Sequence, residues 1–332
     1  MNTDLLAEKS VDESALDRVL VMEMVRVTEA AAVAASQLIG RGDEKAADAA
    51  AVEAMRRAFD TLYMDGTVVI GEGERDEAPM LYIGEKVGGE PGKGPKIDIA
   101  LDPLEGTTIT AKAGPNALAV LAAAEQGNLL NAPDTYMDKI AVGPGYPPDV
   151  IDLAKTATEN VQSVAAAKGV EPHEIIVCVL DRPRHADLIA ELRGIGCGVV
   201  LIGDGDVAGV IAVTDEDTTI DMYMGQGGAP EGVLAAAALK CMGGQMFGRL
   251  LFRNDDEKGR AAKAGISDLD AIYTRDEMVK QDVIFAATGV TDGSILPGIK
   301  REPGVLTAET ILMRSKTGSV RRMTYRNPTA TE

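Results

Sequence analysis

The residues best suited to chemistry are acids that follow two apolar, strand-like runs in the first half of the chain. The run over 67–70 ends at Gly71-Glu72-Gly73-Glu74, and the run over 97–101 ends at Asp102-Pro103-Leu104-Glu105-Gly106-Thr107. Either acidic segment in isolation is typical of a solvated turn. Because the acids recur after consecutive strands, they indicate carboxylates that converge on one place. Hard cations such as Mg²⁺ or Mn²⁺ prefer such oxygen ligands.

Two further acids come from expected helices. Asp48 lies in step with four apolar residues, so that all five share one helix face: Val52, Met55, Phe59 and Leu62. Glu231 follows Pro230 at the start of an Ala-rich helix expected over 230–242. Each acid either complements a helix dipole or points into a site, and the sequence leaves both interpretations open.

Converging carboxylates would repel one another without cations, so a metal-dependent reaction is the natural use of this cluster. Hydrolysis of a phosphate monoester is extremely slow without a catalyst, and two divalent cations can activate water and neutralise the leaving oxygen. Gly106 allows backbone N–H groups to approach a phosphate closely, and the Thr107 hydroxyl can orient the attacking water. Thr107 is equally suited to cap a helix, which is compatible with phosphate binding.

A small basic segment in the second half, Arg182-Pro183-Arg184, stands out in an acidic chain. Two guanidinium groups held by a proline suit the oxygens of a second phosphate, although surface salt bridges would use the same residues. Tyr136 offers a further hydroxyl, but packing alone would also explain this tyrosine.

Gly203-Asp204-Gly205-Asp206-Val207-Ala208 matches the pattern G-x-G-x-x-A between an expected strand and an expected helix. This pattern supports a competing interpretation, a dinucleotide-binding fold. Its two aspartates would oppose a pyrophosphate, and they suit sugar hydroxyls better.

Alternating strands and helices must position these segments. A long Ala-rich helix is expected over 15–40, and strands are expected over 175–180, over 199–202 and near 219–224. This alternation predicts a parallel α/β layer whose ligands bind beyond the carboxyl ends of the strands. A chain of 332 residues is expected to form two α/β domains, over 1–160 and 161–332.

The composition argues against several function classes. The chain has 33 basic and 52 acidic residues, and the net charge of −19 repels nucleic acid and anionic membranes. Aromatic residues make up only 3% and Trp is absent, so base stacking is poorly supplied. No apolar run reaches bilayer length and residues 1–18 lack a signal-peptide pattern, so we expect a cytoplasmic protein. We expect the three cysteines to be buried thiols, and two histidines are too few for a zinc site.

Together these motifs resemble those of the class II fructose-1,6-bisphosphatases, a bacterial family in which some members also hydrolyse sedoheptulose 1,7-bisphosphate. The resemblance runs from about residue 20 to residue 325 and rests on these segments: 40–43, 71–74, 76–85, 102–107, 182–185, 204–206 and 228–232. It implies a two-domain layered α/β sandwich of the type shared with inositol monophosphatases, assembled as a homo-oligomer, either a dimer or a tetramer. The implied reaction is hydrolysis of the 1-phosphate of fructose 1,6-bisphosphate, with Mg²⁺ or Mn²⁺, in gluconeogenesis or a sugar-phosphate cycle.

The resemblance also implies a role for each matching residue. The implied metal ligands are Asp48, Glu72, Asp102, Glu105 and Glu231. Glu105, Gly106 and Thr107 would contact the 1-phosphate, with Thr107, Asp102 and Glu72 in catalytic roles. The segment Arg182-Pro183-Arg184, together with Tyr136, would hold the distal phosphate. The segment Asp204-Gly205-Asp206, together with Gly228, would line the sugar site.

The chain departs from the family pattern at two places. Asp48 is flanked by Ala47 and Ala49 where the family commonly has Thr-Ala-Asp-Gly, and Arg182 stands where many members have Lys. Two other functions stay open from the residues alone: an inositol-phosphate-like monophosphatase, and a non-catalytic nucleotide- or cation-binding module. The arginine pair favours a substrate with a second phosphate.

Overall fold

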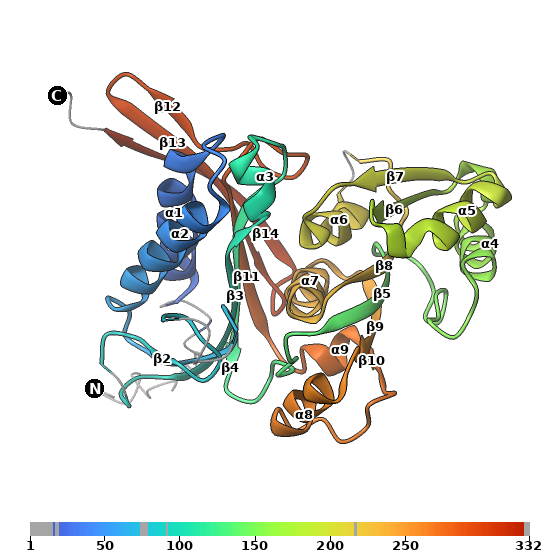
Figure 1. Cartoon of the computed structure of the whole chain (residues 1–332), viewed down its shortest axis with the longest axis horizontal. Helices are drawn as coiled ribbons and strands as arrows, with labels where there is room; N and C mark the ends of the chain where they lie inside the picture. Colours follow the sequence, from blue (N-terminus) through green and yellow to red (C-terminus); the bar gives the residue numbers. More distant parts are fainter. Residues whose placement is uncertain (1–15, 17–19, 74–78, 91, 216–217, 329–332) are drawn as a thin grey trace, which may run out of the picture.

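The computed structural model describes residue 16 and residues 20–73, 79–90, 92–215 and 218–328. Within this part of the chain the strands form two sheets, with helices between the sheets and on both outer faces (Figure 1). Residues 74–78, which include Glu74 of the first acidic motif, lie outside the described residues.

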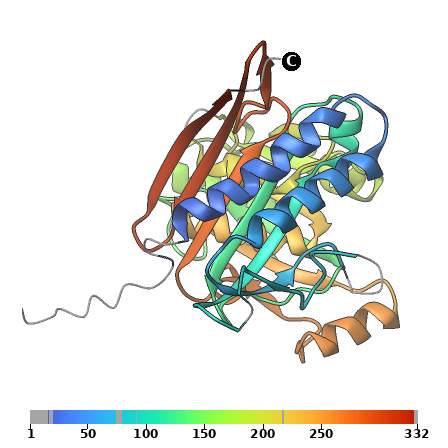
Figure 2. The same cartoon turned by 90° about the vertical axis from the view of Figure 1, so that its left-hand side faces the viewer.

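The first sheet has eight strands in the order β12-β13-β11-β4-β3-β1-β2, with β14 paired to β13. Its strands are β1 (Asp65–Ile70), β2 (Lys86–Val87), β3 (Lys96–Glu105), β4 (Leu118–Glu125), β11 (Val283–Gly289), β12 (Lys300–Glu302), β13 (Val305–Arg314) and β14 (Ser319–Pro328). β1 and β3 run parallel, whereas β4 runs antiparallel to β3. Figure 2 shows α1 (Val21–Ala35) and α2 (Glu44–Phe59) side by side across the outer face of this sheet.

The second sheet has six strands in the order β10-β9-β5-β8-β6-β7. Its strands are β5 (Tyr136–Val142), β6 (Ile176–Leu180), β7 (Gly198–Ile202), β8 (Met222–Gly228), β9 (Gln245–Leu251) and β10 (Ile272–Thr274). α4 (Ala157–Lys168) and α5 (Ala186–Ile195) pack on its outer face. The other helices are α3 (Thr107–Ala111), α6 (Asp206–Ile211), α7 (Ala229–Met242), α8 (Asp255–Lys263) and α9 (Arg275–Met278).

The largest core lies between the two sheets and surrounds α7. This helix is apolar on all sides, as expected for a helix enclosed by protein, and its buried residues include Val233 and Leu239. β4 (Leu-Ala-Val-Leu-Ala-Ala-Ala-Glu) is buried along nearly its whole length. Because its alanines are small, α1 can pack on one face of this strand and α7 on the other. The enclosed α7 therefore holds its first turn, with Glu231, at a fixed place between the sheets.

Most expected elements are present, with altered limits. The first helix ends at Ala35 and is followed by a short 3₁₀ turn, Ser36–Leu38, so the expectation of a helix to residue 40 was too long. β3 runs on to Glu105 instead of ending at residue 101. The strand expected near 219–224 is β8, which begins at Met222 and extends to Gly228, so the first part of the Gly-rich segment after 224 is part of a strand.

The predicted parallel layer is only part of the second sheet. β6 runs parallel to β7 and β8, as the strand–helix alternation predicted. β5 runs antiparallel to β8 and β9, so the sheet is mixed. The local pattern could not reveal these pairings, because β5 joins the sheet from a point in the sequence before the alternation begins.

Sheet membership does not follow a single division of the chain near residue 160. β5 precedes that point and belongs to the second sheet, whereas β11 to β14 return to the first. A division into two folding domains stays a prediction. The three cysteines are buried and free, as expected. Among the described helices, none is long and apolar enough to cross a membrane.

Candidate active site

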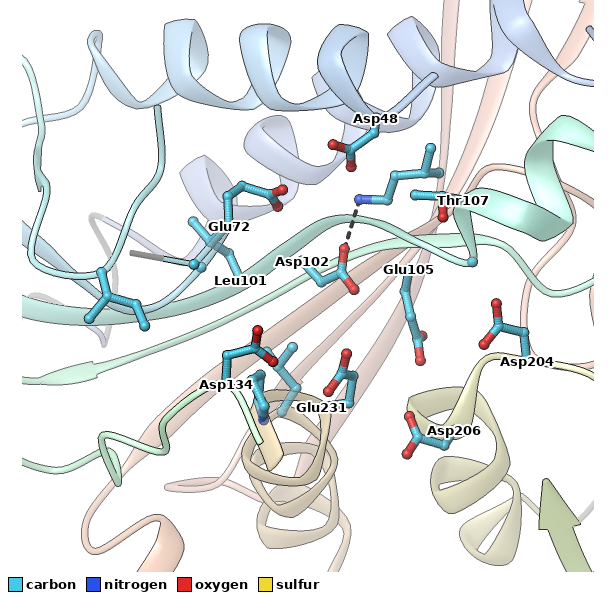
Figure 3. A pocket seen from close by; sticks show the side chains of 17 residues that line it. Asp48, Glu72, Leu101, Asp102, Glu105, Thr107, Asp134, Asp204, Asp206 and Glu231 are labelled. Carbon is cyan, nitrogen blue, oxygen red and sulfur yellow. Dashed lines mark hydrogen bonds between the residues drawn. The ribbon is translucent and has the colours of Figure 1, made fainter. Parts of the chain in front are cut away.

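A cavity of about 370 Å³ lies between the two sheets. Its walls come from α2, the ends of β1 and β3, and the starts of α3, α6 and α7 (Figure 3). Eight of the lining residues are acids: Asp48, Glu72, Asp102, Glu105, Asp134, Asp204, Asp206 and Glu231. Gly106 and Thr107 complete the wall at the start of α3, and none of the described lining residues is Lys, Arg or His. We call this space the acidic cavity.

Asp48 faces the acidic cavity from the second turn of α2. The helix begins at Glu44, and the Asp43 carboxylate caps it by accepting a hydrogen bond from the N–H of Ala46 at 3.0 Å. The helix dipole acts mainly within the first turn, so it does not account for Asp48. The structure therefore supports the alternative that Asp48 points into a site, as Figure 3 shows.

A bulge at the end of β3 aims two acids at the same space. The pairing of β3 with β4 shifts register between Asp102 and Glu105. Asp102 Oδ1 accepts a hydrogen bond from the N–H of Leu104 at 3.0 Å, while Pro103 between them has no N–H to pair. Such a bulge changes the direction of the side chains that follow it, and here both Asp102 and Glu105 line the cavity.

Gly106 has φ 90° and ψ 51° and directly precedes α3. This left-handed conformation favours glycine and turns the chain sharply from β3 into the helix. Thr107 is the first residue of α3, so the N-cap position belongs to Gly106 and the capping interpretation of Thr107 was wrong. The hydroxyl of Thr107 is therefore not engaged as a helix cap, and Thr107 lines the cavity.

Glu105 connects the two sheets. Its Oε1 accepts a hydrogen bond from the N–H of Val207, in the first turn of α6, at 2.9 Å. Its other oxygen, Oε2, is buried and has no hydrogen-bond partner, and the same holds for Oε2 of Glu231. Two buried carboxylate oxygens are thus left unpaired in one cavity.

The field inside the cavity opposes ionisation of its acids. Desolvation, with the nearby charges of Asp48 and Glu231, raises the pKa of Glu72 to about 8. Desolvation also raises the pKa of Asp102 well above its usual range, and Glu72 adds to this effect. Like charges brought together away from water have this result.

The acids on the α6 and α7 side behave in the same way. Desolvation, reinforced by Asp206, raises the pKa of Glu105 well above its usual range. Desolvation and Asp206 raise the pKa of Glu231 to about 7, and Lys139 opposes this rise. A bound cation would relieve the repulsion that all four carboxylates share.

The donor set of the acidic cavity fits a hard divalent cation. Carboxylate oxygens are the ligands that Mg²⁺ and Mn²⁺ prefer, and the unpaired Oε2 atoms of Glu105 and Glu231 supply free ones. Within the described residues, no group of three or more His, Cys, Asp or Glu side chains is arranged so that it could hold a metal ion by itself. In Mg²⁺ sites, water and substrate phosphates usually supply several of the ligands.

Comparison with known proteins identifies the family. Residues 18–327 match the family described as bacterial fructose-1,6-bisphosphatase, glpX-encoded. The chain belongs to this family.

Two relatives agree with the family assignment. The fructose-1,6-bisphosphatase 1 class 2 of Escherichia coli (strain K12) is 46% identical over 319 residues, which cover 92% of this chain and 94% of that protein. The fructose-1,6-bisphosphatase class 2 of Shigella flexneri has the same identity and coverage. Among solved structures, an inositol monophosphatase from Anabaena (Nostoc) sp. PCC 7120 matches with a TM-score of 0.31 and 13% identity, over 58% of this chain and 70% of that one.

In this member of the bisphosphatase family a second group of functional candidates lies outside the cavity lining. The guanidinium carbons of Arg184 and Arg253 each lie 4.8 Å from the centroid of the Tyr136 ring. We call these three residues the basic cluster. Arg184 donates from Nε and Nη2 to the carbonyl of Gln226 at 3.0 and 2.7 Å, which fixes it against β8.

Arg182 does not share the contacts of Arg184. Its Nη2 lies 3.4 Å from Oδ1 of Asp204, and its Nη1 donates to the carbonyl of Gly203. Because Asp204 lines the acidic cavity, Arg182 lies beside the cavity, next to one of its acids. Pro183 begins the short 3₁₀ turn Pro183–His185, which follows Arg182 and carries Arg184.

The remaining glycines predicted from sequence have different local roles. Gly205 precedes α6 with φ 81°, and neither it nor Gly228 is among the residues that line the cavity. A Cβ atom on Gly228 would lie 1.8 Å from Oε2 of Glu231. This glycine therefore leaves room for the Glu231 carboxylate to pack against β8.

Sequence reasoning missed several residues of the site. Asp134 lines the acidic cavity, and Arg253 belongs to the basic cluster. Lys139 is 1% exposed, forms a salt bridge with Asp206 and donates to the carbonyl of Gly228 at 2.9 Å. A lysine close to the apolar residues Ile140, Ala141 and Val142 was the one available signal, because a charge that is buried with them must have a partner.

Proposed function

We propose that this chain hydrolyses the 1-phosphate of fructose 1,6-bisphosphate to fructose 6-phosphate and phosphate, with Mg²⁺ or Mn²⁺ held in the acidic cavity. The observation that carries the proposal is the set of buried, unpaired carboxylates beside Gly106 and Thr107. Membership of the bisphosphatase family supplies the reaction class and the substrate.

The ligands of the cations would be Asp48, Glu72, Asp102, Glu105 and Glu231. When bound, the cations supply a more acidic water and neutralise charge on the phosphate oxygens. The carboxylates would hold these cations in place, in a cavity that is partly shielded from solvent.

The start of α3 would bind the phosphate that is removed. The first N–H groups of a helix have no acceptor within the helix, so Gly106 and Thr107 can donate to phosphate oxygens. The Thr107 hydroxyl would accept a hydrogen bond from, or donate one to, the attacking water and so orient it toward phosphorus. Asp102 and Glu72 would bind the same water through their carboxylate oxygens.

The second phosphate would lie at the basic cluster. Tyr136 and Arg184 would bind it, with Arg182 and Pro183 setting the turn that carries Arg184. Asp204 would accept hydrogen bonds from sugar hydroxyls, and Gly205 and Gly228 would shape the backbone beside the sugar site. Asp206 is already paired with Lys139, so it would position the wall of the sugar site formed by the start of α6.

The dinucleotide-binding interpretation of residues 203–208 loses support from this geometry. The segment does lie between β7 and α6, as that interpretation required. However, Asp204 and Asp206 both line a cavity rich in carboxylates, where a pyrophosphate would meet uncompensated negative charge.

The test is phosphate release from a panel of sugar phosphates at fixed Mg²⁺ or Mn²⁺, repeated with EDTA. We expect release from fructose 1,6-bisphosphate that depends on the cation, and the panel should include sedoheptulose 1,7-bisphosphate and an inositol monophosphate. Metal-independent release, or release only from the inositol phosphate, would contradict the proposal. A cytoplasmic location and assembly as a dimer or tetramer stay predictions.

A further inference from the structure

Arg253 lies at the same end of the second sheet as the segments that line the acidic cavity. It lies two residues after the end of β9, which pairs with β5 so that Leu251 is opposite Tyr136. Its guanidinium carbon lies 4.8 Å from the centre of the Tyr136 ring, the same distance as that of Arg184. One tyrosine therefore brings together two cations from segments about seventy residues apart in a chain of net charge −19.

Both arginines keep a donor free. Arg253 binds Oε1 of Glu257 through Nε at 2.6 Å and Nη2 at 2.5 Å, and Arg184 uses Nε and Nη2 for the carbonyl of Gln226. Within the described residues, neither Nη1 group has a hydrogen-bond partner. The Arg253 side chain is 56% exposed, so its remaining N–H groups can reach a ligand.

Glu257, which is itself fixed by other contacts, holds Arg253 in place. Glu257 is 1% exposed and also accepts hydrogen bonds from the N–H of Arg253 at 2.7 Å and from Oγ1 of Thr135 at 3.0 Å. These contacts hold Arg253 in one orientation before any ligand binds. A guanidinium fork fixed in this way, next to a tyrosine, is well suited to the oxygens of a phosphate.

The basic cluster and the acidic cavity are joined by a short loop. Asp134 lines the cavity, and Tyr136, two residues later, begins β5. Arg260 donates from Nη2 to the carbonyl of Asp134 at 2.8 Å, and Thr135 donates to Glu257, so α8 fixes both ends of this loop. A single small ligand can therefore place one phosphate in the cavity and another at the cluster.

We propose that Arg253 is a ligand of the distal phosphate, alongside Tyr136 and Arg184, and that it increases the preference of the enzyme for bisphosphates over monophosphates. The inference rests on the proposed function, because it needs a substrate with two phosphates. Arg253 differs from Arg184 in that a carboxylate, Glu257, sets its direction.

The experiment measures Arg253→Met with fructose 1,6-bisphosphate as substrate, and fructose 6-phosphate and fructose 1-phosphate as competitors. Loss of a charge-assisted contact should raise both KM for the bisphosphate and Ki for fructose 6-phosphate about 10- to 100-fold. Because fructose 1-phosphate lacks the distal phosphate, its Ki should change less than about twofold, and so should kcat.

Two further variants separate binding from folding. Arg57→Met is the matched control, since Arg57 also pairs with a glutamate four residues away, Glu53, but on α2, and we expect no kinetic change. Arg253→Lys keeps a charge beside Glu257 without the fork, and should give an intermediate Ki for fructose 6-phosphate.

The outcomes are distinguishable. If Arg253→Met or Arg253→Lys raises Ki for both competitors equally, or for neither, Arg253 has only a structural role and the inference is wrong. If the unaltered protein releases no phosphate from fructose 1,6-bisphosphate with either cation, the proposed function itself fails.

Discussion

The acidic cavity and the basic cluster lie side by side, and they differ in whether their charged groups already have partners within the protein. In the cavity, carboxylates face one another, and Oε2 of Glu105 and of Glu231 have no partner. In the cluster, Arg184 is held by the carbonyl of Gln226 and Arg253 by Glu257. The cavity has carboxylate oxygens that a bound cation could pair, whereas the arginines of the cluster are held in position without a ligand.

From this difference we infer separate tasks for the two regions under the proposed function. A bound cation would remove the repulsion between the carboxylates, so we expect charge to change in the cavity during the reaction. A cluster that is already ordered loses little freedom when it binds a phosphate, so we expect it to contribute to affinity and specificity. Substitutions in the cavity should therefore change turnover, and substitutions around the cluster should change KM.

The largest effect is expected for Asp102→Asn. Removing this carboxylate should lower kcat at least about 1,000-fold, equivalent to about 4 kcal/mol in the barrier. The same change removes a repelling charge, so the melting temperature of the metal-free protein should rise by about 2 °C or more. Steady-state kinetics checks the fall in kcat, and calorimetry checks the rise in melting temperature.

Asp98→Asn is the matched control on the same strand. Asp98 is 4% exposed and accepts a hydrogen bond from the N–H of Gly127 at 2.7 Å, away from the cavity. Its substitution should leave kcat within about twofold and should not raise the melting temperature. An Asp102→Asn protein that keeps normal turnover, or that loses stability as Asp98→Asn does, would refute the contrast.

The next effect is the pH dependence of cation binding. The pKa values of Glu72, about 8, and Glu231, about 7, lie above the ordinary value of 4.5. Carboxyl groups whose pKa is raised in the folded state contribute stability below about pH 4.5, and that contribution is lost as the pH rises through 7 and 8. We expect the melting temperature of the EDTA-treated protein to fall between pH 6 and pH 8.5.

Cations and protons compete for the same oxygens, so Mg²⁺ affinity should rise by up to about 10-fold per pH unit over that range. Isothermal titration at several pH values measures this rise, and the stabilisation by Mg²⁺ should grow in parallel. Affinity that is constant from pH 6 to pH 8 would show that these carboxylates are not the ligands.

The contrast between the regions also explains what the sequence could predict. The acids of the cavity follow strands or lie on an apolar helix face, and both patterns are local, so Asp48, Glu72 and Asp102 could be proposed directly. Asp134 and Arg253 follow no such pattern, because a polar residue in a loop is indistinguishable from a solvated one. Their positions depend on the pairing of β5 with β9, which are about a hundred residues apart in sequence.

The same reasoning applies to the fold. The apolar periodicity of α2, the Ala-rich composition of α7 and the apolar runs of β1 and β3 are local and predicted these elements. The return of β11 to β14 to the first sheet depends instead on long-range pairing. The bulge at Asp102 was hidden for a different reason. A proline after a short apolar run is typical of a strand end, and only the pairing with β4 shows that β3 continues to Glu105.

The smallest expected effect concerns His185, which contacts the residue that holds Arg184 of the basic cluster. Its Nδ1 donates to the carbonyl of Leu180 at 2.7 Å, and its Nε2 accepts from the N–H of Gln226 at 2.8 Å, so one neutral tautomer satisfies both contacts. Desolvation lowers the pKa of this histidine, which favours the neutral form. Gln226 is also the residue that holds Arg184, so His185 positions Arg184 through β8.

His185→Phe should therefore raise KM for fructose 1,6-bisphosphate about 3- to 10-fold while kcat changes less than about twofold, because two buried backbone groups lose their partner. His185→Gln restores an acceptor near the Nε2 position and should recover part of the affinity. His173→Phe, at the exposed second histidine, is the control and should match the unaltered protein. Should His185→Phe lower kcat and leave KM unchanged, the basic cluster would take part in turnover, and the division of tasks between the two regions would be wrong.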